Sequence, residues 1–376
     1  MNDLPLVVAY GMGVDSTAVL VQFERLGIRP DRIVFADTGS EADHTYDFHP
    51  VMNEWLRSVD FPEIEVVRYQ ATDFKHWPPY HSLEENCLTN STLPSLAYGG
   101  KSCSQKWKIA PQNKLMDQWE PAQIAWDLGM KVRKVVGYDA GPNDIRRRNH
   151  VARMGTKDAE KYDFWYPLQD WGWDRERCID EIAKSSLPYV PKKSSCYFCP
   201  AMKPHELHSL SKDKLRRIVM IEARPHQRHI DHADAKRDEL RKMRSYVERH
   251  SPTQWPQSIQ KTLKSLFEKL KEKEERAPNR KELLKAIDKK LKSMGQDGTP
   301  LIEGLWRKPV KGFRGATPKP GSMTEYIRSS GLLPSEEIAY IQAQIPSTPI
   351  TKDDIDNWQD WIGSVTTCSS CAGCTC

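Results

Sequence analysis

Short apolar runs alternate with amphipathic stretches along the first third of the chain. The apolar runs predict strands at residues 4–10, 32–37, 63–69 and 131–137. Amphipathic stretches predict helices at residues 15–25 and 43–58. Because strands that alternate with helices form parallel sheets covered on both faces, the pattern predicts an α/β fold with a doubly wound, mostly parallel sheet. Ligands of such folds bind beyond the carboxyl ends of the strands.

Length and composition narrow the class of protein. The chain has 376 residues, enough for one α/β domain and a second module. It contains no run of about 18 apolar residues, and its N-terminus lacks the regions of a secretory signal. We therefore expect a soluble, cytoplasmic protein without a membrane partner. In a reducing compartment, nine cysteines favour metal or redox chemistry over disulfides.

A glycine loop follows the first predicted strand. Gly11, Met12 and Gly13 separate the strand from a helix that starts near Asp15 and Ser16. A strand that breaks into glycines before a helix presents free backbone N–H groups at a positive helix end, which suits a phosphate. The loop lacks the Gly-Lys-Ser/Thr ending of a Walker loop and the G-x-G-x-x-G spacing of a dinucleotide fold. A strand-to-helix turn without a ligand is the alternative.

Polar residues also follow two other predicted strands. The second strand ends in residues 37–39, Asp-Thr-Gly, which suit a ribose, a metal-bound water or a helix cap. The fourth strand ends in Gly137 and Asp139, and Arg146, Arg147 and Arg148 follow shortly after it. These arginines suit either a phosphate clamp or a solvated helix face. We expect these segments at the same edge of the sheet.

Four cysteines give the sharpest chemical signal. Cys196 and Cys199 form a C-x-x-C pair, and Cys87 and Cys103 lie in and after a long loop. Four thiolates close a tetrahedral zinc site or hold a [4Fe–4S] cluster, and spacing does not choose between them. Buried free thiols are a third reading. A fifth cysteine, Cys178, lies in an apolar helical pattern and is expected in the core.

The glycine loop resembles the PP-loop motif S-G-G-x-D-S of the N-type ATP pyrophosphatases and the phosphoadenosine phosphosulfate (PAPS) reductases. Gly13, Asp15 and Ser16 match the motif, whereas Gly11 and Met12 replace its Ser and Gly. The combination of motifs over residues 5–205 resembles the PAPS reductase-like family. It is similar to the ATP pyrophosphatase of DNA phosphorothioation.

Three further segments support this resemblance. Residues 37–41 resemble the family's D-T-G-x-E segment, which lies beside the nucleotide. Residues 101–111 resemble its C-T/S-x-x-x-K-I-x-P signature, in which Lys106 and Lys108 supply positive charge. Residues 166–202 resemble the part of the family that ends in the C-x-x-C pair. The resemblance therefore connects the cysteines with a nucleotide site.

The resemblance implies an enzyme that binds ATP or PAPS with Mg²⁺. It implies catalytic roles for Asp15, Ser16 and Lys106, which would hold the metal or the loop, bond the pyrophosphate and offset charge. The cofactor-binding residues would be Gly11, Gly13, Asp15, Ser16, Thr17, Asp37, Thr38 and Gly39. A [4Fe–4S] cluster, or zinc as the alternative, would be held by Cys87, Cys103, Cys196 and Cys199.

The activity implied first is an ATP pyrophosphatase that adenylates an acceptor for sulfur transfer in nucleic-acid modification. A cysteine desulfurase or a reductant would then be a partner. One alternative is a PAPS reductase that forms sulfite. The other is a non-catalytic module that binds a nucleotide or nucleic acid in a defence or modification complex.

The second half of the chain has a different character. Residues 201–300 contain 25 Lys and Arg against 15 Asp and Glu, a net charge of +10, whereas the whole chain has +5. Helical patterns at 211–249 and 258–292 present basic faces that suit DNA or RNA, or ordinary solubility. We therefore divide the chain into a PP-loop domain, a basic helical module, a Gly/Pro-rich linker with short helices and a Cys-rich tail, at residues 1–205, 206–300, 301–360 and 361–376.

The tail contains four thiols, at Cys368, Cys371, Cys374 and Cys376. Small polar residues separate them, which predicts a mobile segment. PAPS reductases use a cysteine on a mobile C-terminal tail, but their Cys-Gly-Ile-His ending is absent here. The thiols therefore suit a persulfide relay, a second metal site or no function.

Overall fold

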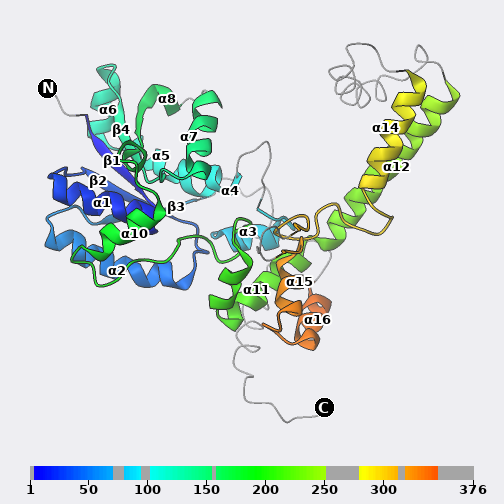
Figure 1. The fold of residues 1–376 in the computed structure, drawn as a ribbon. Helices are drawn as coiled ribbons and strands as arrows, with labels where there is room; N and C mark the ends of the chain where they lie inside the picture. Colours follow the sequence, from blue (N-terminus) through cyan, green and yellow to red (C-terminus); the bar gives the residue numbers. More distant parts are fainter. Residues whose placement is uncertain are drawn as a thin grey trace, which may run out of the picture. The chain divides into compact units, whose positions relative to one another are not determined.

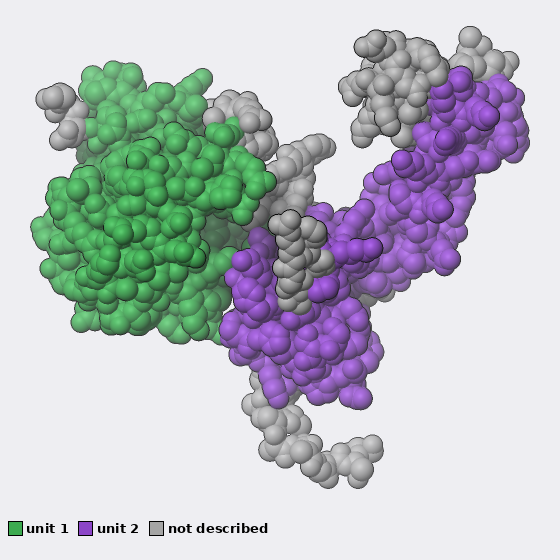
Figure 2. All heavy atoms as spheres, viewed as in Figure 1, with its two compact units in different colours: residues 1–90, 94–199, 350–376 green, residues 91–93, 200–349 purple. Residues whose placement is uncertain are grey.

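The computed structural model describes residues 4–70, 80–94, 102–154, 158–250, 279–311 and 318–345. The chain divides into two compact units (Figure 2): unit 1 contains residues 1–90 and 94–199, and unit 2 contains residues 91–93 and 200–349. The predicted helical pattern at 258–278 and the cysteine tail at 361–376 lie outside the described residues. Within the described part, no helix is both long enough and apolar enough to span a bilayer.

Unit 1 is built on a five-stranded parallel sheet with the order β3-β2-β1-β4-β5. The strands are β1 (Leu6–Tyr10), β2 (Arg32–Asp37), β3 (Ile64–Arg68), β4 (Val132–Val136) and β5 (Tyr162–Trp165). The strand order reverses between β1 and β4, so the crevice beyond their carboxyl ends is the topological switch point of the sheet. The predicted doubly wound α/β class is confirmed. The sequence pattern misses β5, because this strand is a short run that includes a charged Asp163.

Helices cover both faces of the sheet (Figure 1). Strand side chains alternate between two cores: Val8 and Tyr10 of β1 face one core, and Val7 faces the other. The first core is closed by α1 (Val14–Leu26), α2 (Asp43–Ser58) and α10 (Arg175–Ala183), and the second by α5 (Ala110–Met116) and α6 (Glu120–Asp127). Cys178 of α10 is fully buried in the first core, which confirms its predicted place.

The other helical segments of unit 1 lie in the connections. They are α3 (Leu83–Thr89), α4 (Ser102–Ser104), the π-helical turn η2 (Gln105–Ile109), α7 (Pro142–Met154), α8 (Asp158–Lys161) and α9 (Pro167–Asp170). The N-terminus of α3 is fixed to the loop after β2, because the N–H of Leu83 donates to the carbonyl of Thr38 at 2.9 Å. Connections after β2, β3 and β4 therefore converge on one edge of the sheet.

Unit 2 is helical. It contains η3 (Pro204–Ser209), α11 (Lys212–Ala223), α12 (His226–Arg249), α14 (Arg280–Ser293), α15 (Met323–Ser329) and α16 (Ser335–Gln344). The prediction of a single helix at residues 211–249 is wrong, since the helix is interrupted at Arg224 and Pro225. Proline lacks an N–H donor and disfavours the helical conformation of the residue before it.

A buried carboxylate holds the compact end of unit 2 together. Glu222 of α11 is 6% exposed and accepts four hydrogen bonds. Its donors are the N–H groups of Leu305 (2.6 Å), Met323 (2.9 Å) and Thr324 (2.8 Å) and the hydroxyl of Ser322 (2.6 Å). Residues 301–345, predicted to form a linker and short helices, thus include two helices, α15 and α16, that pack on α11.

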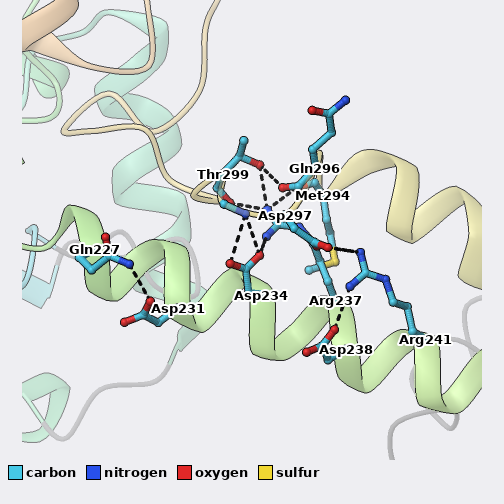
Figure 3. A network of polar contacts seen from close by, with 11 residues as sticks. Gln227, Asp231, Asp234, Arg237, Asp238, Arg241, Met294, Gln296, Asp297 and Thr299 are labelled. Carbon is cyan, nitrogen blue, oxygen red and sulfur yellow. Dashed lines mark hydrogen bonds and ion pairs between the residues drawn. The ribbon is translucent and has the colours of Figure 1, made fainter.

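Helices α12 and α14 pair in antiparallel directions. Arg244 of α12 binds Asp288 at 2.6 Å, and Arg280 of α14 donates to the carbonyl of His250 at 3.0 Å. Figure 3 shows the opposite end of the pair, where the buried Arg237 lies among residues of both segments. Arg237 binds Asp234 and donates to the carbonyl of Met294 at 3.0 Å. The loop after α14 is therefore fixed to α12 by a buried guanidinium.

Candidate functional site

The glycine loop forms the turn between β1 and α1. Gly13 is the N-cap residue, and no side chain caps the helix start, so the first N–H groups of α1 have no partner within the helix. The Ser16 hydroxyl donates to the Gly13 carbonyl at 3.3 Å and accepts from the Gly11 N–H at 3.2 Å. These bonds shape the loop from within and leave the helix end open. A phosphate is suited to such a helix end.

Met12 occupies the position where the family motif has a glycine. Its φ is 56°, in the left-handed region that costs a side-chain-bearing residue about 1 kcal/mol. Its side chain is 1% exposed and belongs to the core on the α1 face of the sheet. Thr17 also faces inward, since its hydroxyl lies 3.0 Å from the hydroxyl of Tyr10 in the core. The structure therefore gives the Thr17 hydroxyl a partner inside the core.

Two glycines permit close approaches to the loop. A Cβ on Gly137, after β4, would lie 2.9 Å from the backbone N and Cα of Ser16. A Cβ on Gly13 would lie 2.7 Å from the hydroxyl oxygen of Ser194. Real Cβ contacts are longer, so glycine is required at position 137, where the neighbour is backbone, whereas a methyl group at position 13 would displace the Ser194 hydroxyl. Ser194 was not a predicted site residue, because only the fold brings it to the loop.

Three carboxylates gather beside the glycine loop. Oxygens of Asp15 on α1, Asp139 after β4 and Asp144 on α7 lie within 4.8 Å of one another. Burial raises the pKa of Asp15 to about 6; Arg175, 3.2 Å away, opposes the rise, whereas Asp139 and Asp144 add to it. Carboxylate oxygens are preferred ligands of Mg²⁺, so the set fits the metal that the resemblance implies. Asp139 and Asp144 are additions to the predicted site.

The loop after β2 is closed by its own hydrogen bonds. One oxygen of Asp37 accepts from the Gly39 N–H and the Tyr46 hydroxyl, both at 2.8 Å. The other oxygen accepts from Arg68 at 2.7 and 2.9 Å, and the side chain is 2% exposed. Gly39 has a φ of 67°, and a Cβ there would lie 2.8 Å from Cβ of Ser82. The structure thus assigns structural contacts to Asp37 and Gly39, two of the predicted nucleotide-binding residues.

A buried ion pair extends this loop. Glu41 is fully buried, and its Oε1 accepts from the Thr38 hydroxyl and from Lys108, both at 3.0 Å. Burial alone would lower the pKa of Lys108, but Glu41 raises it above its usual value. The Oε2 atom of Glu41 has no hydrogen-bond partner among the described residues. Thr38, predicted to bind the nucleotide, uses its hydroxyl inside the loop.

Lys106 lies in an aromatic cage. Its Nζ donates to the Tyr80 hydroxyl at 2.9 Å and to Oδ1 of Asn86 at 3.1 Å. The ring centroids of Tyr69, Tyr80 and Trp107 lie 4.6 to 5.6 Å from the same atom. In the described part of the chain, Lys106 makes no hydrogen bond or ion pair with the glycine loop. Its charge is therefore stabilised by π faces and uncharged oxygens.

The four predicted metal-ligating cysteines lie in two pairs. The thiol of Cys196 is hydrogen-bonded to that of Cys199, and this hydrogen bond together with burial raises the pKa of Cys196. Burial raises the pKa of Cys87, with a smaller contribution from the nearby Cys103. No three of the four sulfurs lie within 4.8 Å of one another, although all four residues are described. A closed zinc site needs sulfurs about 3.8 Å apart, so the fold does not preassemble one.

The segment before the C-x-x-C pair is fixed to the loop after β2. The N–H of Ala42 donates to the carbonyl of Ser195, and the N–H of Tyr197 donates to the carbonyl of Ser40, both at 3.1 Å. Glu41 and Cys196 form an antiparallel bridge between these bonds. The C-x-x-C pair and the loop after β2 are thus joined by backbone contacts.

The three arginines of α7 have separate environments. The Tyr138 and Tyr166 rings stack with centroids 5.6 Å apart. The guanidinium of Arg147 lies over Tyr138 and that of Arg148 over Tyr166, at 5.6 and 5.0 Å. Arg146 donates to a carbonyl of its own helix. Only Arg147 reaches the acidic cluster, where it binds Asp144 at 2.9 Å.

Comparison of the chain with protein-family models gives no match, and comparison with curated proteins gives none either. The likeness to the PAPS reductase-like family therefore depends on the motifs alone.

Proposed function

We propose that the chain binds ATP at the glycine loop and transfers its AMP moiety to an acceptor oxygen, which activates the acceptor for sulfur transfer. One observation supports this above the others: the uncapped start of α1 and three carboxylates lie together at the switch point of a parallel sheet. The helix start suits a polyphosphate, and the carboxylates suit the divalent cation that accompanies ATP.

In the proposed reaction, the acceptor oxygen attacks the α-phosphorus of ATP. A bond forms between these atoms, and the bond from the α-phosphorus to the oxygen that bridges to the β-phosphate breaks, so pyrophosphate leaves with that oxygen. N–H groups at the start of α1 stabilise its negative charge. Asp15, Asp139 and Asp144 would hold Mg²⁺, which supplies charge neutralisation when bound. Arg175 orients Asp15.

The cysteine pairs are the proposed source of sulfur chemistry. Cys87, Cys103, Cys196 and Cys199 have the donor type that holds an iron–sulfur cluster, which supplies electron or sulfur transfer when bound. Lys106 lies near Cys87, and Lys108 lies near Cys196 and Cys199. Each lysine partly opposes the rise in thiol pKa that burial causes, Lys106 at Cys87 and Lys108 at Cys196.

A groove on α12 supports a nucleic acid as the acceptor. This open groove has a volume of about 440 Å³ and is lined by Arg241, Lys242, Ser245, Tyr246, Arg249 and His250. The rings of Tyr246 and His250 stack with centroids 4.1 Å apart. Cations beside aromatic rings suit phosphates and bases, although Arg241 already binds Asp238 and Asp297. Binding to this face should weaken steeply as salt rises.

The test measures pyrophosphate and AMP formed from ATP and Mg²⁺ with DNA and RNA acceptors. Asp15→Ala/Ser16→Ala should lose turnover at least 100-fold while its thermal unfolding stays cooperative. Asp163→Ala is the matched control, because Asp163 lies in an exposed pair with Arg133. Full activity in the double variant would remove the glycine-loop assignment.

Two other results would redirect the assignment. Sulfite formed from PAPS, without pyrophosphate from ATP, would make the chain a PAPS reductase. Salt-dependent binding of DNA or RNA without any product from either nucleotide would make it a binding module.

A further inference from the structure

We propose that Ser194 is a nucleotide-contacting residue whose hydroxyl completes the phosphate cradle over the glycines of the loop. This inference rests on the proposed function, because it requires a phosphate ligand at the glycine loop. It assigns to the segment before the C-x-x-C pair a direct part in nucleotide binding, besides its place in the sulfur site.

The hydroxyl of Ser194 lies beside the glycine loop. The Oγ of Ser194 lies 2.7 Å from the place where a Cβ on Gly13 would be and 3.7 Å from the corresponding place on Gly11. It therefore lies directly over the two glycines of the loop. No hydrogen bond joins this hydroxyl to another described residue, whereas the Ser16 hydroxyl is already bonded to Gly11 and Gly13. Ser194 thus offers a side-chain donor besides the backbone N–H groups of α1.

Backbone contacts hold Ser194 in place on both sides. The carbonyl of Lys193 lies 3.1 Å from Nε2 of His44, and the carbonyl of Ser195 accepts from Ala42 at 3.1 Å. Because both anchors belong to the segment after β2, the backbone that carries Ser194 is positioned before a ligand arrives. A preorganised donor loses little entropy on binding.

The hydroxyl would donate a hydrogen bond to a phosphate oxygen. A bond from a neutral donor to a charged acceptor is among the stronger hydrogen bonds in proteins. Its removal should weaken ATP binding about 10- to 100-fold. Cys196 follows Ser194 by two residues, so the same segment would bring a thiol near the bound phosphates.

The experiment is calorimetric titration of the full chain with the α,β-methylene analogue of ATP and Mg²⁺. This analogue resists cleavage between its α and β phosphates, so binding is measured without turnover. Ser194→Ala is compared with Ser195→Ala, the matched control, because Ser195 contributes only its carbonyl to the described contacts. Support requires about 10- to 100-fold weaker binding for Ser194→Ala and less than about 2-fold change for Ser195→Ala.

A double-variant cycle separates contact from general damage to the loop. Gly13→Ala should weaken binding, because its methyl group displaces the Ser194 hydroxyl. In Gly13→Ala/Ser194→Ala the clash with the oxygen is gone, so the combined loss should be clearly smaller than the product of the two single losses. Thermal unfolding of each variant checks that it folds.

The remaining outcomes overturn the inference. Equal binding by Ser194→Ala and wild type, or tighter binding by the variant, would show that the hydroxyl does not contact phosphate. If the loss of affinity in the double variant equals the product of the two single losses, the proposed contact with Gly13 is overturned. Failure of the wild type to bind the analogue would overturn the proposed function, and the inference with it.

Discussion

Asp15 and Asp37 lie at the same edge of one sheet, but their surroundings are opposite. Asp37 accepts hydrogen bonds from Gly39, Tyr46 and Arg68, which fill both of its oxygens. Asp15 has Arg175 as its ion-pair partner and two further carboxylates close by. A strand-end position therefore does not by itself make a ligand site. A carboxylate whose bonds are filled by its own chain stabilises the fold, whereas a desolvated one among like charges favours a cation.

The largest expected effect is on the Asp37 side of this comparison. Asp37→Ala should lower the free energy of unfolding by about 3 kcal/mol, because the Gly39 N–H, the Tyr46 hydroxyl and the Arg68 guanidinium all lose the acceptor of a part-buried hydrogen bond. Chemical denaturation measures the change. Asp163→Ala, which breaks the exposed pair with Arg133, should cost less than about 1 kcal/mol. Similar losses in both variants would contradict the structural role of Asp37.

The packing behind the Asp15 loop gives the next largest effect. Gly137→Ala places a methyl group 2.9 Å from the backbone of Ser16, so the first turn of α1 must move. We expect a loss of about 2 kcal/mol in stability, together with weaker ATP binding. Gly11→Ala is the control for stability, since its Cβ would make ordinary contacts at 3.7 Å. Unchanged stability and ATP binding in Gly137→Ala would refute this packing.

The smallest expected change in stability is a gain, and it comes from replacing Asp15. The pKa of Asp15 is raised to about 6, so ionisation opposes folding above pH 6 and the penalty fades as the pH falls toward 3.8. Asp15→Asn should therefore stabilise the chain by about 1 to 2 kcal/mol at pH 7.5, and the difference from wild type should vanish near pH 4. Thermal unfolding across this pH range measures it.

Magnesium sharpens this test. Added Mg²⁺ should raise the unfolding temperature of wild type at pH 7.5 and have much less effect on Asp15→Asn, because one carboxylate ligand is lost. Turnover of the variant should be lost even though it is more stable. Destabilisation by Asp15→Asn at pH 7.5 would show that Asp15, like Asp37, serves the fold.

The parallel sheet was predictable because its strands are buried on both faces. Residues 32–37 and 131–137 are apolar enough to stand out from the helices between them, and each gave a strand in the structure. β5 is short and includes Asp163, so it lacks that contrast. The long helix predicted in unit 2 failed for a local reason that the sequence does contain, since Pro225 interrupts it. The prediction gave more weight to the helical pattern of the whole segment than to this one proline.

The sequence indicated which residues are candidates for a site, but not what each of them contacts in the fold. The glycines, Asp15 and the C-x-x-C pair can be recognised from the chain because their spacing has few uses. Whether Asp37 binds a ligand or closes a turn could not be recognised, because the answer depends on Arg68 and Tyr46. Lys106 was expected near the phosphate, but aromatic rings from distant segments surround it.

The sequence by itself determined the fold class of unit 1 and the edge of the sheet where polar residues gather, because hydrophobic period and turn residues are local properties of the chain. Only the tertiary structure decided that Asp139 and Asp144 join Asp15, that Ser194 lies over Gly13, and that Asp37 is already saturated. Those outcomes depend on distances between residues far apart in the chain. Such distances are set by strand order and by the packing of connections, which no local pattern encodes.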